Sequence, residues 1–166
     1  MVSVPLPENN DGGRRGFGKG RDDEPNFEAL PDSLPPQNLE AEEAVLGGIL
    51  LDPDAIGRVA DVLQPEAFYL NAHREIFRTA LMLHGQGKPT DLTAMSAWLA
   101  DTGALEKVGG NNRLVELVER VPSTASIEQV ARLVMDKFLR RQLIRSGNEV
   151  IQLGFDQSLP MEQVLD

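Results

Sequence analysis

The chain has 166 residues and a formal net charge of −10, which suits one domain with or without a flexible tail and excludes a second large domain. Its 41% of hydrophobic and 25% of charged residues are typical of a globular protein and exclude the disordered and membrane classes. Because cysteine is absent, disulfides, thiolate zinc sites and cysteine nucleophiles are excluded as well.

Residues 1–35 are rich in glycine, proline and charged side chains and show no helical or strand period, so we predict a disordered tail. The tail has charges and glycines where a secretory signal would be apolar. No apolar run in the chain approaches the roughly 18 residues that span a bilayer. We therefore expect a cytoplasmic location and no membrane partner.

A P-loop-like pattern lies within this tail. Gly13, Gly18 and Lys19 match the motif, but Gly20 stands where the motif has a hydroxyl residue that binds Mg²⁺. A P-loop also needs a strand before it and a helix after it, and neither is indicated here. The sequence therefore predicts no catalytic residue and no bound cofactor or metal in this chain. An alternative is non-specific contact with nucleic acid through the basic residues of the tail, Arg14, Arg15, Lys19 and Arg21.

Residues 36–122 show apolar side chains at helical spacing, which predicts a globular helical head. One stripe, expected to follow Asp52 as N-cap and Pro53 as the first helical residue, comprises Ile56, Val59, Ala60 and Leu63. The next, expected to follow Asn71 as N-cap, comprises His73, Ile76, Phe77, Ala80, Leu81 and His84. The last, which Pro122 ends, comprises Leu114, Leu117, Val118 and Val121. No segment alternates as a strand would, so the predicted fold is all-α.

Two adjacent glycines, Gly47 and Gly48, interrupt an otherwise helical pattern. Each costs a helix about 1 kcal/mol relative to alanine. They predict either close packing against another helix or the end of this one.

Few residues of the head are candidates for chemistry. His73 and His84 are eleven positions apart on one predicted helix, or roughly 16 Å, which is too far for one metal ion. The carboxylates of Glu42, Glu43 and Glu75 could in principle form a catalytic pair, but such a pair needs a cleft. We interpret them as solvated or helix-capping groups.

Residues 123–155 predict the longest helix, which begins at a capping box formed by Ser126 and Gln129. About 28 residues at ~1.5 Å each make a rod of roughly 40 Å. One apolar face is expected to pack on the helix over residues 114–121, and it comprises Ile127, Val130, Val134 and Phe138. A second apolar face predicts self-association with a two-fold partner helix, and it comprises Met135, Leu139, Leu143, Ile144 and Ile151.

The same helix carries a basic cluster formed by Arg132, Lys137, Arg140, Arg141 and Arg145. A solvated face is the simplest interpretation, and contact with an acidic protein partner or with DNA is the alternative. The net negative charge makes the domain a poor candidate to hold DNA alone.

A series of short segments is more specific than any of these motifs. It comprises Pro35-Pro36, Leu39–Asp52, Phe68-Tyr69, His73 with Ile76-Phe77, Gly87–Leu92, Gly109-Gly110, Pro122–Ala125 and Asn148-Glu149. In this order, the series resembles the DnaB family of replicative DNA helicases from about residue 35 to the end of the chain. The chain departs from the family at Ala67, where an acidic residue is usual, and at Val130-Ala131, where a tyrosine–alanine pair is usual.

The resemblance implies a globular helical head followed by a long helical hairpin. It implies that copies pair as dimers through the hairpins, that three dimers form a collar on a hexameric ring, and that the collar recruits primase and a helicase loader. Single-stranded DNA would pass through the ring. Residues 156–166 would begin a linker to a RecA-like domain that binds ATP and Mg²⁺. We therefore expect that this chain alone is not an enzyme, and a free-standing helical adaptor is the alternative function.

Overall fold

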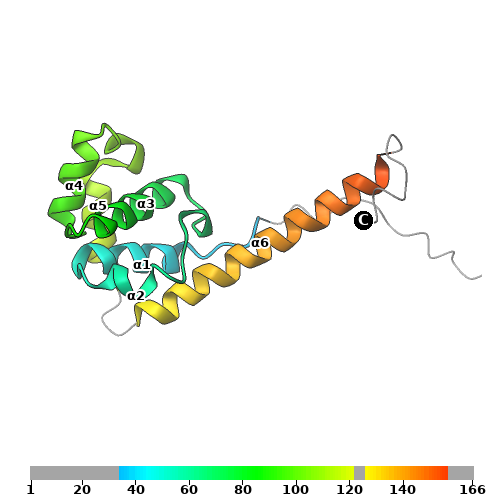
Figure 1. Ribbon diagram of the computed structural model, residues 1–166, viewed down its shortest axis with the longest axis horizontal. Coiled ribbons are helices and arrows are strands. Elements are labelled where there is room, and N and C mark those ends of the chain that lie inside the picture. Colours follow the sequence, from blue (N-terminus) through cyan, green and yellow to red (C-terminus); the bar gives the residue numbers. More distant parts are fainter. Residues whose placement is uncertain (1–33, 122–125, 157–166) are drawn as a thin grey trace, which may run out of the picture. The chain divides into compact units, whose positions relative to one another are not determined.

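The computed structural model describes residues 34–121 and 126–156, and among these residues it contains helices and no strands (Figure 1). In chain order the elements are α1 (Leu39–Leu51), α2 (Ala55–Val59), the 3₁₀ turn η1 (Pro65–Ala67), α3 (Asn71–Gly85), α4 (Leu92–Asp101), the 3₁₀ turn η2 (Glu106–Val108), α5 (Gly110–Glu119) and α6 (Ile127–Phe155). The predicted all-α fold is confirmed. No helix of the described part is long and apolar enough to cross a membrane. The P-loop-like residues and Pro122 lie outside the described residues.

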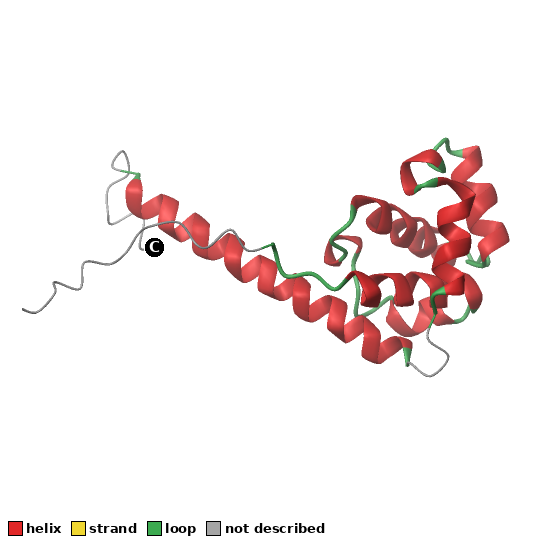
Figure 2. Ribbon diagram, turned by 180° about the vertical axis from the view of Figure 1, so that it is seen from behind, coloured by secondary structure: helices red, strands yellow, loops and turns green. Residues whose placement is uncertain are grey.

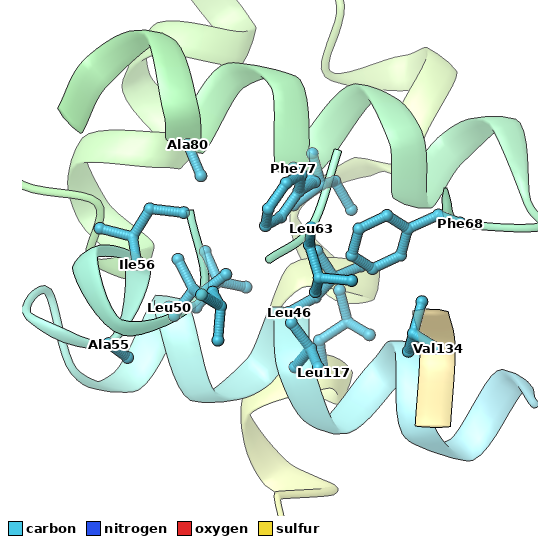
Figure 3. Packing of buried hydrophobic residues seen from close by; sticks show 14 of the residues in the cluster. Leu46, Leu50, Ala55, Ile56, Leu63, Phe68, Phe77, Ala80, Leu117 and Val134 are labelled. Atoms are coloured by element: carbon cyan, nitrogen blue, oxygen red, sulfur yellow. The ribbon is translucent and has the colours of Figure 1, made fainter. Parts of the chain in front are cut away.

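The hydrophobic core surrounds α1, which contacts α3, α5 and α6. Helices α1 to α5 together form the head, and the α6 ribbon runs past α1 and α2 (Figure 2). Figure 3 shows Phe77, Leu63, Leu46 and Phe68 gathered between α1 and α3, and the rings of the two phenylalanines lie 4.9 Å apart. Burial of such large apolar side chains is the main favourable contribution to folding.

The glycines of α1 allow its close packing, and the helix continues through them to Leu51. A Cβ atom at Gly47 would collide with the backbone carbonyl of Leu117 and lie 2.6 Å from Cγ2 of Val121. A Cβ atom at Gly48 would lie 3.2 Å from Cδ1 of Ile127, in α6. Two consecutive glycines therefore let α5 and α6 approach α1 from different sides.

Three helix starts differ from the sequence prediction. Asp52 ends α1, and its carboxylate accepts a hydrogen bond from the backbone N–H of Asp54 at 3.0 Å, so α2 begins only at Ala55. Asn71 is the first residue of α3 rather than its N-cap. Ser126 is the N-cap of α6, but its hydroxyl donates to the Glu128 carboxylate and does not cap the helix, so the predicted capping box is absent.

Helix α6 packs mainly on α1, with α2 and η1 beside it. The prediction that one apolar face of α6 packs on the helix over residues 114–121 is wrong, because Gly48 lets α6 approach α1 instead. After Gln142, all described residues of α6 are exposed, and the ribbon extends away from the head (Figure 1). The long helix predicted over residues 123–155 therefore corresponds to α6, and the hairpin stays a prediction.

Candidate interaction surface

Helix α6 has one apolar face toward the head and a second toward solvent. On the head side, Ala131, Val134 and Phe138 are buried. Several large apolar side chains of α6 are exposed to solvent, and five of them, with exposed fractions of 44% to 74%, are Leu139, Leu143, Ile144, Val150 and Ile151. A large exposed apolar face on a helix is the usual mark of a protein-binding surface. We refer to these five residues as the α6 apolar face.

Three pairs of residues spaced by seven positions run along this part of the helix. They are Leu143 with Val150, Gly147 with Gly154, and Ile144 with Ile151. Seven residues make nearly two turns, so each pair forms a row along the axis, and the glycine row lies between the other two rows. Nothing lies within 4 Å of the position that a Cβ atom would take at either glycine. A glycine groove between two apolar ridges lets a second helix approach closely.

The residues that we predicted for self-association differ in their exposure. Met135 packs partly against the core of the head, whereas Leu139, Leu143, Ile144 and Ile151 are exposed. Val150 was not among the residues predicted from the sequence, although its spacing of seven from Leu143 could have revealed it.

The basic cluster of α6 does not form one surface. Lys137 and Arg140 both contact the carboxylate of Asp136, at 3.8 and 3.0 Å. The hydrogen bond from Arg140 lowers the pKa of Asp136 below its ordinary value. Arg132, Arg140 and Arg145 are exposed. Because Arg140 already pairs with Asp136, Arg132 and Arg145 are the members of the cluster best placed to contact an acidic partner.

Arg141, the remaining member, belongs to the fold itself. Its guanidinium donates to the backbone carbonyls of Pro36 at 2.7 Å and Ala67 at 2.6 Å. It also lies 5.7 Å from the ring centroid of Tyr69 and 5.8 Å from that of Phe138. We call this set of contacts the Arg141 clasp.

A buried polar pair joins α1 and α3. The carboxylate of Glu42 accepts a hydrogen bond from His73 Nδ1 at 2.8 Å and another from the backbone N–H of Tyr69 at 2.6 Å. Arg113 Nη2 lies 3.3 Å from the other ring nitrogen, Nε2. Because Glu42 accepts and Arg113 donates, these contacts fit the imidazole tautomer with its proton on Nδ1.

A second carboxylate, Glu43, lies beside this pair and connects α1 to α5. It accepts hydrogen bonds from Arg113 at 2.6 Å and Arg120 at 2.9 Å. Burial alone would raise the pKa of Glu43, but the hydrogen bonds from the two arginines outweigh it, and the pKa lies below its ordinary value. The ion pairs therefore hold α5 to α1 in addition to the close contact at Gly47.

Our prediction that Glu42 and Glu43 are solvated or capping groups is wrong. The side chains of Glu42 and His73 are only 2% and 1% exposed, because Glu42 points into the core from the same side of α1 as Val45 and Leu46. Glu75 lies on the surface and pairs with Arg78 at 2.8 Å.

This geometry favours binding over catalysis. The Glu42–His73 pair is closed to solvent and both carboxylate oxygens have partners, so it has no access to a substrate. Among the described residues, no group of three or more histidine, cysteine, aspartate or glutamate side chains could hold a metal ion. A shallow groove of about 420 Å³ between α4 and α5 is lined by uncharged residues: Leu92, Thr93, Ser96, Ala97, Asn111 and Val115.

Sequence comparisons place the chain among known proteins. Residues 34–136 match the family model described as DnaB-like helicase N terminal domain. The chain is 57% identical over 133 residues to the replicative DNA helicase DnaB of Nostoc sp. (strain PCC 7120 / SAG 25.82 / UTEX 2576), covering 80% of this chain and 15% of that protein. It is 41% identical over 136 residues to the replicative DNA helicase DnaC of Bacillus subtilis (strain 168), covering 82% of this chain and 30% of that protein. The chain thus spans less than a third of these relatives.

Solved structures show the same similarity. The crystal structure of the N-terminal domain of DnaB helicase from Mycobacterium tuberculosis matches with a TM-score of 0.75 and 38% identity, over 80% of this chain and 94% of that chain. A structure described as a DnaB-like replicative helicase and its interactions with primase matches with a TM-score of 0.65 and 30% identity, over 77% of this chain and 30% of that chain.

Proposed function

Because this chain belongs to the DnaB-like helicase N-terminal domain family, as the sequence predicted, we propose that it is the assembly and interaction module of a replicative DNA helicase. Its first partner is a second copy of itself, paired through the α6 apolar face. Three such dimers form a collar on a hexameric ring through which single-stranded DNA passes. ATP and Mg²⁺ are bound by a RecA-like domain of the whole helicase and not by the residues described above.

The exposure of the α6 apolar face is the observation that carries this proposal. Full burial of one leucine or isoleucine side chain stabilises by about 1.5–3 kcal/mol, so covering a half-exposed one contributes on the order of 1 kcal/mol. Five such residues on each of two copies give roughly 10 kcal/mol. This is comparable to the cost of association, about 4–15 kcal/mol. A single charge in the interface is therefore enough to prevent pairing.

Primase and a helicase loader are the further partners that we propose. Support for primase comes from the similarity to a helicase whose structure is described together with its interactions with primase. Arg132 and Arg145 are exposed cations of α6, and exposed cations fit an acidic protein surface through electrostatic complementarity.

The oligomeric state of the purified chain tests the pairing. Leu143, the most exposed member of the α6 apolar face, is changed to aspartate, which pairing would bury without a partner. The matched control is Leu51→Asp, at a leucine of the head that is 61% exposed. Light scattering across a concentration series should show a dimer or larger species for the wild type and for Leu51→Asp, and a monomer for Leu143→Asp.

Two outcomes would contradict the proposal. If the wild type remains a monomer at high concentration, the α6 apolar face does not bind a second copy. If Leu143→Asp pairs as strongly as the wild type, the copies pair elsewhere on the chain. Circular dichroism at each concentration confirms that all three proteins remain equally helical.

A further inference from the structure

The Arg141 clasp lies near the point where α6 leaves the head. Phe138 is 9% exposed, whereas Leu143, five positions later, is 74% exposed. Between them, the guanidinium of Arg141 donates to two carbonyls that belong to separate parts of the head, the segment before α1 and the end of η1. We propose that Arg141 is a positioning residue that fixes the direction in which α6 leaves the head.

The partners of Arg141 fit such a role. Carbonyl oxygens and ring faces bind a guanidinium only in defined orientations, because its donors form a rigid planar fork. Burial lowers the pKa of Arg141 below its ordinary value, so the side chain gives up solvation to reach this position. An arginine that served only solubility would extend into water instead.

The loop that receives Arg141 is held from three sides. Ala67 O accepts from Arg141 of α6, Phe68 O accepts from Arg74 of α3 at 2.7 Å, and the backbone N–H of Tyr69 donates to Glu42 of α1. Three consecutive residues are thus tied to three helices. Because these hydrogen bonds restrict the movement of the loop, the Arg141 clasp couples the direction of α6 to α1 and α3.

The length of α6 beyond the clasp makes its direction important. From Gln142 to Phe155 the helix extends roughly 20 Å at 1.5 Å per residue. A change of ~10° at the clasp would therefore move its far end by about 3 Å, more than half the rise of one turn. If copies pair through α6, the clasp determines where the two heads lie relative to each other. This consequence rests on the proposed function, whereas the clasp itself does not.

Spin labels can measure the direction of α6 directly. The chain has no cysteine, so Ala100→Cys on α4 and Glu149→Cys on α6, both exposed and in helices, give two unique labels. Doubly labelled chain is diluted into excess unlabelled chain, so that only distances within one molecule are recorded. We compare the parent with Arg141→Met and with Arg140→Met, the matched control, since Arg140 is bonded to Asp136 on α6 itself.

The parent and Arg140→Met should show the same single narrow distribution of distances between the two spin labels. In Arg141→Met this distribution should be broad. A distribution in Arg141→Met as narrow as in the parent, at the same distance, would overturn the proposal. If Arg141→Met fails to fold by circular dichroism, Arg141→Lys decides. The lysine side chain has a single nitrogen in place of the two donor nitrogens of arginine. A broadened distance distribution in Arg141→Lys therefore supports the proposal, and an unchanged distribution overturns it. Light scattering on the same variants reports pairing separately, so failure of the clasp and failure of the proposed function are distinguishable.

Discussion

Gly47→Ala tests whether close contact between α1 and α5 is essential to the head. The new Cβ would collide with the carbonyl oxygen of Leu117 and lie 2.6 Å from Cγ2 of Val121. A backbone carbonyl cannot rotate away, so α5 as a whole would have to shift. Overpacking of this kind costs about 1–3 kcal/mol, and contact with backbone puts it at the upper end. The better helix propensity of alanine returns about 1 kcal/mol.

We therefore expect Gly47→Ala to lower the free energy of unfolding by about 1–2 kcal/mol. The melting temperature should fall by roughly 3–6 °C for each kcal/mol in a domain of this size. The matched control is Gly57→Ala in α2, where the new Cβ would lie 3.7 Å from the ring of His84, an ordinary van der Waals contact. That variant should be as stable as the wild type or up to about 1 kcal/mol more stable.

Urea and thermal unfolding, followed by circular dichroism, measure both variants. Because the same change from glycine to alanine is expected to lower the free energy of unfolding at Gly47 but not at Gly57, a general effect of alanine on helices cannot explain both results. If Gly47→Ala is as stable as Gly57→Ala, then α5 does not depend on close contact with Gly47, and our explanation of the paired glycines is wrong.

Three further predictions concern the polar groups and the activity of the chain. Because the pKa of Glu43 is lowered in the folded state from its ordinary 4.5, its stabilising contribution is complete above about pH 4.5 and is lost as the pH falls further; in urea titrations, Glu43→Gln should flatten this part of the stability profile. His73→Leu leaves the buried carboxylate of Glu42 without one of its hydrogen-bond donors, which should cost about 3 kcal/mol, and Glu42→Gln, which keeps an acceptor for Tyr69 N–H, should cost less in the same unfolding assay. The purified chain should show no steady ATP hydrolysis, and hydrolysis that Lys19→Ala abolishes would contradict our prediction that residues 13–20 do not form a P-loop.

The helices with one apolar stripe were predictable from sequence, and α4 was not. In α3 and α5 the apolar residues recur on one side, and both predicted stripes are confirmed in part. His73, Ile76, Phe77 and Ala80 of α3 and Leu114 and Leu117 of α5 are buried. His84 is exposed, the buried Leu83 was not predicted, and Val121 lies beyond the end of α5. In α4, alanine and other small residues occur on all sides of the helix, and only Met95 and Leu99 are buried. The sequence of α4 therefore shows no clear apolar stripe. Its start signal was present, because the carboxylate of Asp91 accepts from the backbone N–H groups of Thr93 and Ala94, as an N-cap does.

The partners of buried polar groups depend on tertiary structure that the sequence does not contain. Glu42 and His73 are 31 positions apart, and no local pattern pairs them. A weaker signal was available, since Glu42 lies three and four positions before Val45 and Leu46 and thus on the apolar side of α1. A charged residue at such a position indicates a buried partner, although it does not say which one.

The two roles of α6 explain why its sequence was only partly interpretable. A helix that packs on a head along its first half and exposes apolar residues along its second half has apolar side chains on opposite sides, so periodicity alone shows two faces without saying where each is used. Exposure of Leu139 and Leu143 followed from that pattern, whereas the position of Met135 against the core did not. Arg141 looked like one of five solvated cations, and only the fold brings Pro36 and Ala67, far away in sequence, to its guanidinium. The residue that fastens α6 to the head was therefore hidden among residues that a partner could contact.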